Sequence, residues 1–324
     1  MRYKYFVGFE HQKIHSAFIK KIFPGDDVVF ASDDKTSEFP NSIFEHDGND
    51  VVWFFNDLYI NLHPRLKGRQ ILVGHGLGFG RFMTKERAHC INLYIDHVFS
   101  TGVTCEEFRI DAGTDPSKIC RIGYTYPFLV PKIKTESNNI LFSSTYFKNW
   151  DHYSNLNRIL EHLDDTYTGF FTYHPQTPKS LIEPLLETCN SKKNISIVST
   201  QEELLVALAK CDRGVFGGPT SVSATFMFFS KPIIYVRGRV GINPLKGLGW
   251  RRIKKLTDHP IFDKHLEECV KVSNWKKLTP EVLNSAKASH SAREIFYPWN
   301  TDESEVTQRI KQCIDNLESQ YSNI

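Results

Sequence analysis

The chain has 324 residues, of which 40% are hydrophobic and 24% are charged. These values are typical of globular proteins and exclude a disordered, collagen-like or coiled-coil chain, and the length predicts two domains or one large one. The 40 Lys and Arg residues against 37 Asp and Glu leave a net charge of +3, which is too small to identify nucleic acid or an anionic membrane as a partner.

The cysteines indicate a reduced compartment. There are 7 of them, an odd number, scattered along the chain without a Cys-x-x-Cys pair, so neither a disulfide framework nor a zinc knuckle is expected. The first residues lack the apolar region of a secretory signal, and no apolar run approaches the ~18 residues of a membrane span. We therefore expect a cytoplasmic protein. Peripheral association with the inner membrane face is compatible with the same observations.

The first part of the chain alternates short apolar strands with segments compatible with helix. A strand at Tyr5–Phe9 leads into a helix at His11–Ile22, which Pro24 to Asp26 end before a second strand at Asp27–Ala31. Further strands are predicted at Val51–Phe55, Gln70–Val73 and His97–Ser100. This alternation is typical of a doubly wound α/β sheet.

The same pattern starts again after Pro131. Strands are predicted at Ile140–Phe142, Gly169–Tyr173, Asn194–Val198, Gly214–Phe216 and Pro232–Val236, with helices at Asn155–Leu163, Gln201–Ala209, Ser223–Phe229 and Ser304–Leu317. We predict two Rossmann-like domains, residues 1–131 and 132–300, hinged near 128–138. Residues 301–324 are predicted to form an amphipathic helix that crosses back to the first domain.

A glycine-rich loop follows the predicted strand Gln70–Val73. It places His75 between Gly74, Gly76 and Gly78, at a strand's carboxyl end, where open α/β sheets bind ligands. A turn with a solvated histidine is an equally good interpretation, and the spacing does not match a dinucleotide fingerprint.

Two further segments follow strands of the second half. His174, before a proline, could donate to a phosphate oxygen, although a structural histidine is the commoner case. Gly217 and Gly218 lead into Thr220 and Ser221 at the start of a predicted helix, whose unpaired first-turn amides and dipole favour an anion. Thr220 or Ser221 would cap that helix as well as bind a ligand.

No metal site is predicted. The acidic pairs, Asp33 with Asp34 and Asp164 with Asp165, are adjacent residues whose side chains point apart. No cluster of Cys and His residues occurs.

Taken in order, these segments resemble the CDP-glycerol glycerophosphotransferase family of teichoic-acid and capsule polymerases, which have the two-domain GT-B fold. Four segments carry the resemblance. Gly74 to Gly78 resembles the family's Trp-His-Gly-Thr-Pro loop, and Ile140 to Tyr146 resembles its strand ending in Ala-Pro-Thr-Trp. Tyr173 to Pro175 resembles its Pro-His-Pro segment, and Gly218 to Tyr235 resembles its Asp-Tyr-Ser-Ser-Val helix with the following Lys-Arg-Pro strand. The chain departs from the pattern at Gly74, Gly218 and Thr225, where the family has a tryptophan and two acidic residues.

The resemblance implies a metal-independent GT-B transferase without a cofactor. It would move a polyol-phosphate or sugar from a nucleotide-activated, CDP-linked donor to a hydroxyl of a surface glycan or lipid-linked acceptor. His75 would be the general base for the acceptor hydroxyl. The donor phosphates would be held by His174, Thr220, Ser221, Ser144, Thr145 and Lys148, with loop backbone from Gly74, Gly76, Gly78, Gly217 and Gly218.

Two alternatives remain. A GT-B glycosyltransferase would use a UDP-, GDP- or CMP-sugar and another acceptor, including DNA. Basic residues between Arg237 and Lys255 raise the question of nucleic acid, which the small net charge of +3 disfavours without excluding it. A catalytically inactive GT-B-like binding protein is the other alternative, since the acids of the family's pattern are missing at Gly218 and Thr225.

Overall fold

The computed structural model describes residues 2–8, 10–29, 50–55, 68–73, 84–144, 150–175, 177–216, 220–236, 268–272, 275–289 and 302–322. The chain divides into two compact units. Unit 1 contains residues 1–129 and 294–324, and unit 2 contains residues 130–293.

Unit 1 is built on a parallel sheet, which in the described residues has 6 strands in the order β2-β1-β3-β4-β5-β6. The strands are β1 (Tyr3–Val7), β2 (Asp26–Val29), β3 (Val51–Phe54), β4 (Arg69–Leu72), β5 (His97–Ser100) and β6 (Ile119–Arg121). Strands β3 and β5 are buried along their whole length, and β3 is wholly apolar, as expected for a parallel sheet covered on both faces.

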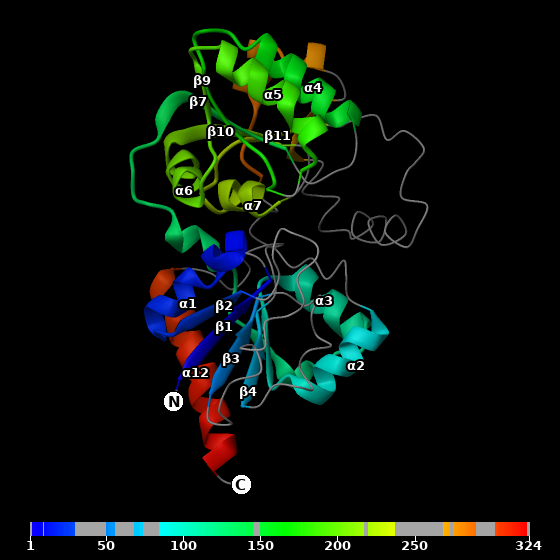
Figure 1. Ribbon diagram of the computed structural model, residues 1–324, viewed down its shortest axis with the longest axis vertical. Helices are drawn as coiled ribbons and strands as arrows, with labels where there is room; N and C mark the ends of the chain where they lie inside the picture. Colours follow the sequence, from blue (N-terminus) through cyan, green and yellow to red (C-terminus); the bar gives the residue numbers. More distant parts are fainter. Residues whose placement is uncertain are drawn as a thin grey trace. The chain divides into compact units, whose positions relative to one another are not determined.

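Helices cover both faces of this sheet (Figure 1). They are α1 (Ala17–Ile22), α2 (Lys85–Tyr94), α3 (Val103–Asp111) and α12 (Glu303–Ser322), with 3-10 turns η1 (Glu10–His15), η4 (Pro116–Lys118) and η5 (Tyr126–Leu129). The apolar side chains of α1 and α12 belong to one core cluster with Tyr5 and Trp53, whereas Ala88 and Ile91 of α2 belong to a second cluster with Phe6. The C-terminal helix therefore completes the core of unit 1.

The helix predicted at His11–Ile22 is wrong in its first half. Residues Glu10–His15 form a 3-10 helix, and the α-helix begins only at Ala17. The amide of Ser16 donates to the Lys13 carbonyl at 3.0 Å, and the Ser16 hydroxyl lies 2.7 Å from the same oxygen. This serine closes a tight turn of the 3-10 type instead of continuing an α-helical ladder.

Unit 2 is built on a second parallel sheet, of 6 described strands in the order β12-β11-β10-β7-β8-β9. The strands are β7 (Glu136–Ser143), β8 (Thr168–Thr172), β9 (Ile195–Ile197), β10 (Cys211–Phe216), β11 (Ile233–Val236) and β12 (Val270–Val272). Numbered from β7, this is the Rossmann order 3-2-1-4-5-6, in which the direction of winding changes between β7 and β10.

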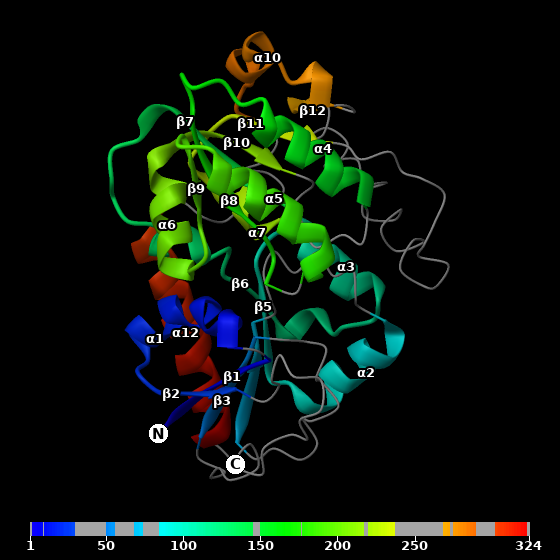
Figure 2. The ribbon, with the colours of Figure 1, turned by 45° about the horizontal axis from the view of Figure 1, so that its top comes forward.

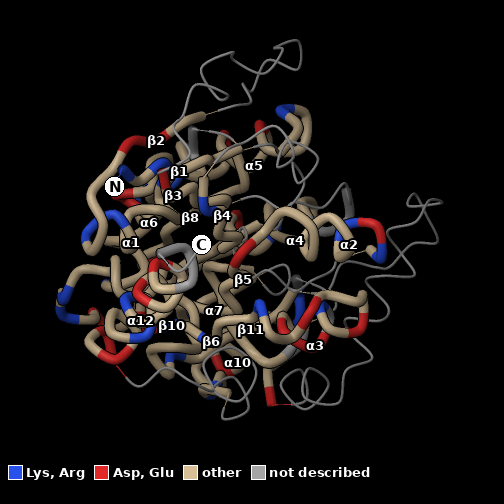
Figure 3. Tube along the Cα trace, turned by 90° about the horizontal axis from the view of Figure 1, so that it is seen from below, with Lys and Arg blue, Asp and Glu red and all other residues tan. Residues whose placement is uncertain are grey.

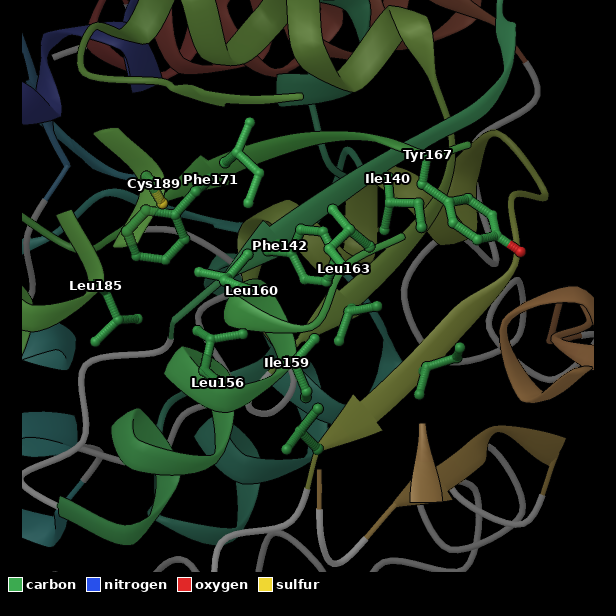
Figure 4. Packing of buried hydrophobic residues seen from close by; sticks show 14 of the residues in the cluster. Ile140, Phe142, Leu156, Ile159, Leu160, Leu163, Tyr167, Phe171, Leu185 and Cys189 are labelled. Carbon is green, nitrogen blue, oxygen red and sulfur yellow. The ribbon is translucent and has the colours of Figure 1, made fainter. Parts of the chain in front are cut away.

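Among the described helices of unit 2, α4 and α5 cover one face of this sheet, and α6 and α7 cover the other (Figure 1). They are α4 (Trp150–Glu161), α5 (Lys179–Ser191), α6 (Gln201–Lys210) and α7 (Ser221–Phe228); η6 (Trp275–Lys277) and α10 (Pro280–Ser285) follow β12 (Figure 2). Figure 4 shows the core under α4, where Leu156 and Leu160 lie with Phe142 of β7 and Phe171 of β8. Both sheets thus have the doubly wound α/β architecture that the sequence predicts.

Lys231 holds the end of α6 against the chain that enters β11. Its ammonium donates to three backbone carbonyls, those of Leu208, Ala209 and Cys211, at 2.7 to 2.8 Å. Burial lowers the pKa of this lysine, but the three carbonyls satisfy its donors and lie at a helix C-terminus, which favours a cation. Lys231, the lysine of the Lys-Pro segment, therefore has a structural role in this chain.

The surface charge is mixed. Lys or Arg and Asp or Glu occur together along α2, where Glu86 lies between Lys85 and Arg87, and along α3 (Figure 3). This pattern matches the small net charge of +3.

Candidate functional site

The site predicted in unit 2 lies at the carboxyl edge of its sheet. The central strands β10, β7 and β8 end level with one another, because Phe216 pairs with Ser143 and Ser143 pairs with Thr172. The residues that follow these strands therefore meet at one edge, next to the change in winding direction, where ligands bind in open α/β sheets. Ser144, His174 and Thr220 are brought to this edge by the topology.

Ser144, the first residue after β7, is buried and incompletely bonded. This residue is only 3% exposed, and its amide donates to the Thr172 carbonyl at 3.2 Å. Its hydroxyl has no hydrogen-bond partner in the described part of the chain. A buried polar group without a partner costs about 1–3 kcal/mol, so this hydroxyl is well suited to receive a ligand group.

The first turn of α7 is held by a capping box. The Thr220 hydroxyl accepts from the Ser223 amide at 3.2 Å, and the Ser223 hydroxyl accepts from the Thr220 amide at 2.8 Å. Thr220 therefore caps the helix, as expected, and its own O–H remains able to donate. No described residue accepts from the amides of Ser221 and Val222, which together with the helix dipole form an arrangement that favours an anion.

His174 follows β8 in a tight turn. It is partly buried, and its carbonyl accepts from the Thr177 amide at 2.8 Å. Thr177 is 7% exposed, and its hydroxyl has no partner among the residues that the structure describes. Thr177 is not among the site residues predicted from the sequence. A hydroxyl two residues after the His-Pro pair, in a turn that follows a strand at the ligand-binding edge, is the signal that could have identified it.

Thr225 stands where the resembling family has an acid, and it is fully buried. Its hydroxyl donates to the Ser221 carbonyl at 2.8 Å, one turn back in α7. An ionised carboxylate in that position would also be fully buried, and burying a charge is costly unless it is paired. The buried faces of α7 therefore explain why an uncharged residue occupies this position.

The remaining predicted residues lie outside the described part of the structure. In unit 2 these are Thr145, Lys148, Gly217 and Gly218, and in unit 1 they are Gly74, His75, Gly76 and Gly78. Strand β4, which precedes the His75 loop, is described and ends at Leu72.

The described residues contain no group of three or more His, Cys, Asp or Glu side chains that could hold a metal ion. Among the same residues, no helix combines the length and apolar character needed to cross a membrane.

No protein-family model and no curated protein sequence matches this chain. Solved structures match it over nearly its full length. The wall teichoic acid polymerase TagF, soaked with CDPG, is 12% identical, with a TM-score of 0.59 over 99% of this chain and 89% of that one. The chain has the GT-B fold. HepE from Anabaena in complex with UDP-glucose is 11% identical, with a TM-score of 0.57 over 98% of this chain and 100% of that one. The UDP-GlcNAc 2-epimerase from Neisseria meningitidis bound to UDP-GlcNAc is also 11% identical, with a TM-score of 0.58 over 98% of this chain and 100% of that one.

The two resemblances agree at the level of the fold. The sequence segments point to a family of GT-B polymerases, and the structural neighbours are GT-B proteins solved with nucleotides or nucleotide-linked sugars. At 11–12% identity, these neighbours establish the fold of this chain and not its substrate.

Proposed function

We propose that the protein is a transferase that moves a polyol-phosphate or a sugar from a nucleotide-activated, CDP-linked donor to a hydroxyl of a surface glycan or lipid-linked acceptor. The observation that most directly supports a donor site is the buried Ser144 hydroxyl without a partner, at the same sheet edge as the first turn of α7. Both features suit the diphosphate of such a donor.

The donor phosphates would lie over the first turn of α7. The amides of Ser221 and Val222 would donate to phosphate oxygens, and so would the hydroxyls of Ser144, Thr220 and Ser221. His174 would donate from the end of β8. These groups stabilise negative charge without a metal, because helix-terminal amides and hydroxyls are fixed in place before the reaction. Thr145 and Lys148 are proposed to reach the same phosphates.

His75 would act on the acceptor. Its imidazole would take the proton of the acceptor hydroxyl as the oxygen attacks the phosphorus or sugar carbon of the donor. One bond forms from the acceptor oxygen, the bond to the nucleotide phosphate breaks, and the nucleotide leaves with the electron pair. The protein would carry out this step in the cytoplasm, with peripheral contact to the membrane where the acceptor is lipid-linked.

A second candidate differs in the donor. Structures solved with UDP-glucose and UDP-GlcNAc are as similar to this chain as TagF is, which favours testing UDP-sugars beside CDP-linked donors. The reaction would keep the same general base and the same phosphate-binding groups, with a sugar carbon as the site of attack.

A thermal-shift panel of CDP-glycerol, CDP-ribitol and CMP-, UDP- and GDP-sugars tests the proposal. A ligand present at 100 times its Kd stabilises the folded protein by ~2.7 kcal/mol, so the right donor raises the melting temperature while the other nucleotides do not. The expected result is stabilisation by a CDP-linked donor. If only UDP-sugars stabilise, the second candidate replaces the first, and if none of the nucleotides does, the proposed donor site is wrong.

A further inference from the structure

The C-terminal helix and an edge strand of unit 1 each place one cysteine in the same core. Cys120 is the middle residue of β6, and it pairs in register with Phe99 of β5. Because side chains alternate along a strand, Cys120 and Ile122 point to the same face. Phe99 and Ile122 both belong to the core cluster that includes α12, and Cys120 packs against it.

Cys313 comes to that core from α12. The buried residues of this helix, Val306, Ile310, Ile314 and Leu317, repeat at helical spacing and form its inward stripe. Cys313 lies three residues after Ile310 and four before Leu317, so it stands on the edge of this stripe, and it packs against the same cluster as Cys120.

The two thiols contact each other. A side-chain hydrogen bond joins Cys120 and Cys313, which raises the pKa of Cys120 and lowers that of Cys313, because the Cys120 S–H donates to the Cys313 thiolate. Both residues are partly exposed, whereas Cys105, Cys189 and Cys211 are buried. The pair therefore combines contact, partial access to solvent and one thiol that ionises more readily than the other.

We propose that Cys120 and Cys313 form a disulfide on exposure to a mild thiol oxidant, and that this modification fastens the C-terminal helix to the sheet of unit 1. This inference does not depend on the proposed function.

The oxidant we assign is a small-molecule disulfide such as oxidised glutathione. The Cys313 thiolate attacks one of its sulfur atoms, which forms a mixed disulfide and releases one glutathione thiolate. The Cys120 thiol then loses its proton and attacks the Cys313 sulfur, which forms the protein disulfide and releases the second glutathione. The protein loses two hydrogens and two electrons, and the oxidant gains them as two thiols.

The two cysteines are far apart in the sequence. Unit 2, residues 130–293, lies wholly between the two cysteines in sequence. A disulfide would close a covalent ring of residues 120 to 313 around both connections between the units. Since a bridge stabilises mainly by restricting the unfolded chain, and more so for a long ring, the oxidised protein should melt at a higher temperature than the reduced one.

The test is oxidation of the folded protein with oxidised glutathione, followed by alkylation and peptide mass analysis. We expect the 7 thiols of the chain to fall by two, with one cross-linked peptide pair containing Cys120 and Cys313. In Cys120→Ser and in Cys313→Ser, no protein disulfide should form. The remaining thiols should stay free, or carry a glutathione that a reductant removes. Cys90→Ser is the matched control, because Cys90 is also partly exposed and lies in the same unit on α2, and it should form the bridge like the wild type.

A second measurement uses only the wild-type protein, so its outcome does not depend on whether a variant folds. After oxidation, a single proteolytic cut between residues 121 and 312 should leave a chain that runs as one species without reductant and as two fragments with it. A melting temperature several degrees above that of the reduced protein should accompany this. Unchanged thiol number, a bridge between other cysteines, or fragments that separate without reductant would each overturn the proposal.

Discussion

Thr220 and Ser223 hold each other across the first turn of α7, each hydroxyl accepting from the other's amide, at 3.2 and 2.8 Å. This reciprocal cap fixes the helix start at the sheet edge where we propose the donor phosphates bind. The same residue, Thr220, thus has a structural contact and a proposed ligand contact.

These two roles of Thr220 can be separated by Thr220→Ala. Loss of the cap should cost about 1 kcal/mol of folding free energy, and loss of a hydroxyl on the phosphates should also weaken donor binding. Thr200→Ala is the matched control, because Thr200 caps α6 of the same unit with an equivalent capping box. Chemical unfolding and calorimetry should show similar destabilisation in both variants and weaker donor binding only in Thr220→Ala. Equal donor affinity in the two would limit Thr220 to its cap.

Ser144→Ala should have the opposite pattern. Removing a buried hydroxyl that has no partner should leave stability unchanged or slightly raised. A hydrogen bond to a charged phosphate is worth about 1.5–3 kcal/mol, so donor affinity should fall by roughly 10- to 100-fold. Ser100→Ala is the control in unit 1, since the buried Ser100 hydroxyl donates to the Gly102 carbonyl at 3.1 Å; it should lose stability and keep donor affinity. A destabilised Ser144→Ala with normal donor binding would contradict this assignment.

The fold was predictable where strands are apolar and continuous. Val51–Phe54 and His97–Ser100 form strands within one residue of their predicted ends. The strands β6 and β12 have three residues each, too few for a periodic signal. Helix α5 was missed as well; it contains Pro184 inside, which argues against a helix in sequence reasoning, although its buried residues repeat at helical spacing.

The site was predictable only in its position along the chain. Ser144 and Thr220 follow strands, and the sequence places them there, but the missing partner of the Ser144 hydroxyl is a consequence of packing that no local pattern encodes. The same holds for Thr225, whose buried hydroxyl bonds a carbonyl of its own helix. The contact between Cys120 and Cys313 joins distant parts of the chain, so it requires the tertiary structure.

His97 should make the protein less stable in mild acid. Burial lowers its pKa below the usual 6.5, against smaller opposing effects of Asp96, and Lys118 lowers it further. Below pH 6.5 the unfolded chain therefore binds a proton that the folded protein does not, so stability present above that pH is lost as the pH falls. Urea unfolding at several pH values should show a weaker acid effect in His97→Gln than in the wild type. An unchanged slope in His97→Gln would exclude this residue as its source.

Activity should survive chelation. The proposed phosphate ligands are amides, hydroxyls and a histidine, which stabilise a leaving phosphate without a cation. Turnover with and without EDTA is the measurement, with a Mg²⁺-dependent transferase assayed in parallel to show that the chelator acts. Complete loss of turnover that Mg²⁺ or Mn²⁺ restores would show that the reaction requires a metal.

The proposed role of His75 as general base gives the sharpest kinetic test. A base acts mainly in the transition state, so His75→Ala should lower kcat by ~10²–10⁴ and leave donor Kd nearly unchanged. His89→Ala is the control, since His89 is an exposed histidine on α2 of the same unit, and it should keep wild-type turnover.

The pH profile provides an independent check on His75. In the wild type, kcat/KM should fall as the pH drops through the range in which histidine takes up a proton, because a protonated imidazole cannot accept the acceptor's proton. That acidic limb should be absent from the residual activity of His75→Ala and present in His89→Ala. A structural histidine would give the reverse, a lower melting temperature with a modest kinetic change. If His75→Ala kept more than about a tenth of wild-type turnover, far from the ~10²-fold loss expected of a general base, the base would have to be sought elsewhere, first at Glu10 and His11, which follow β1.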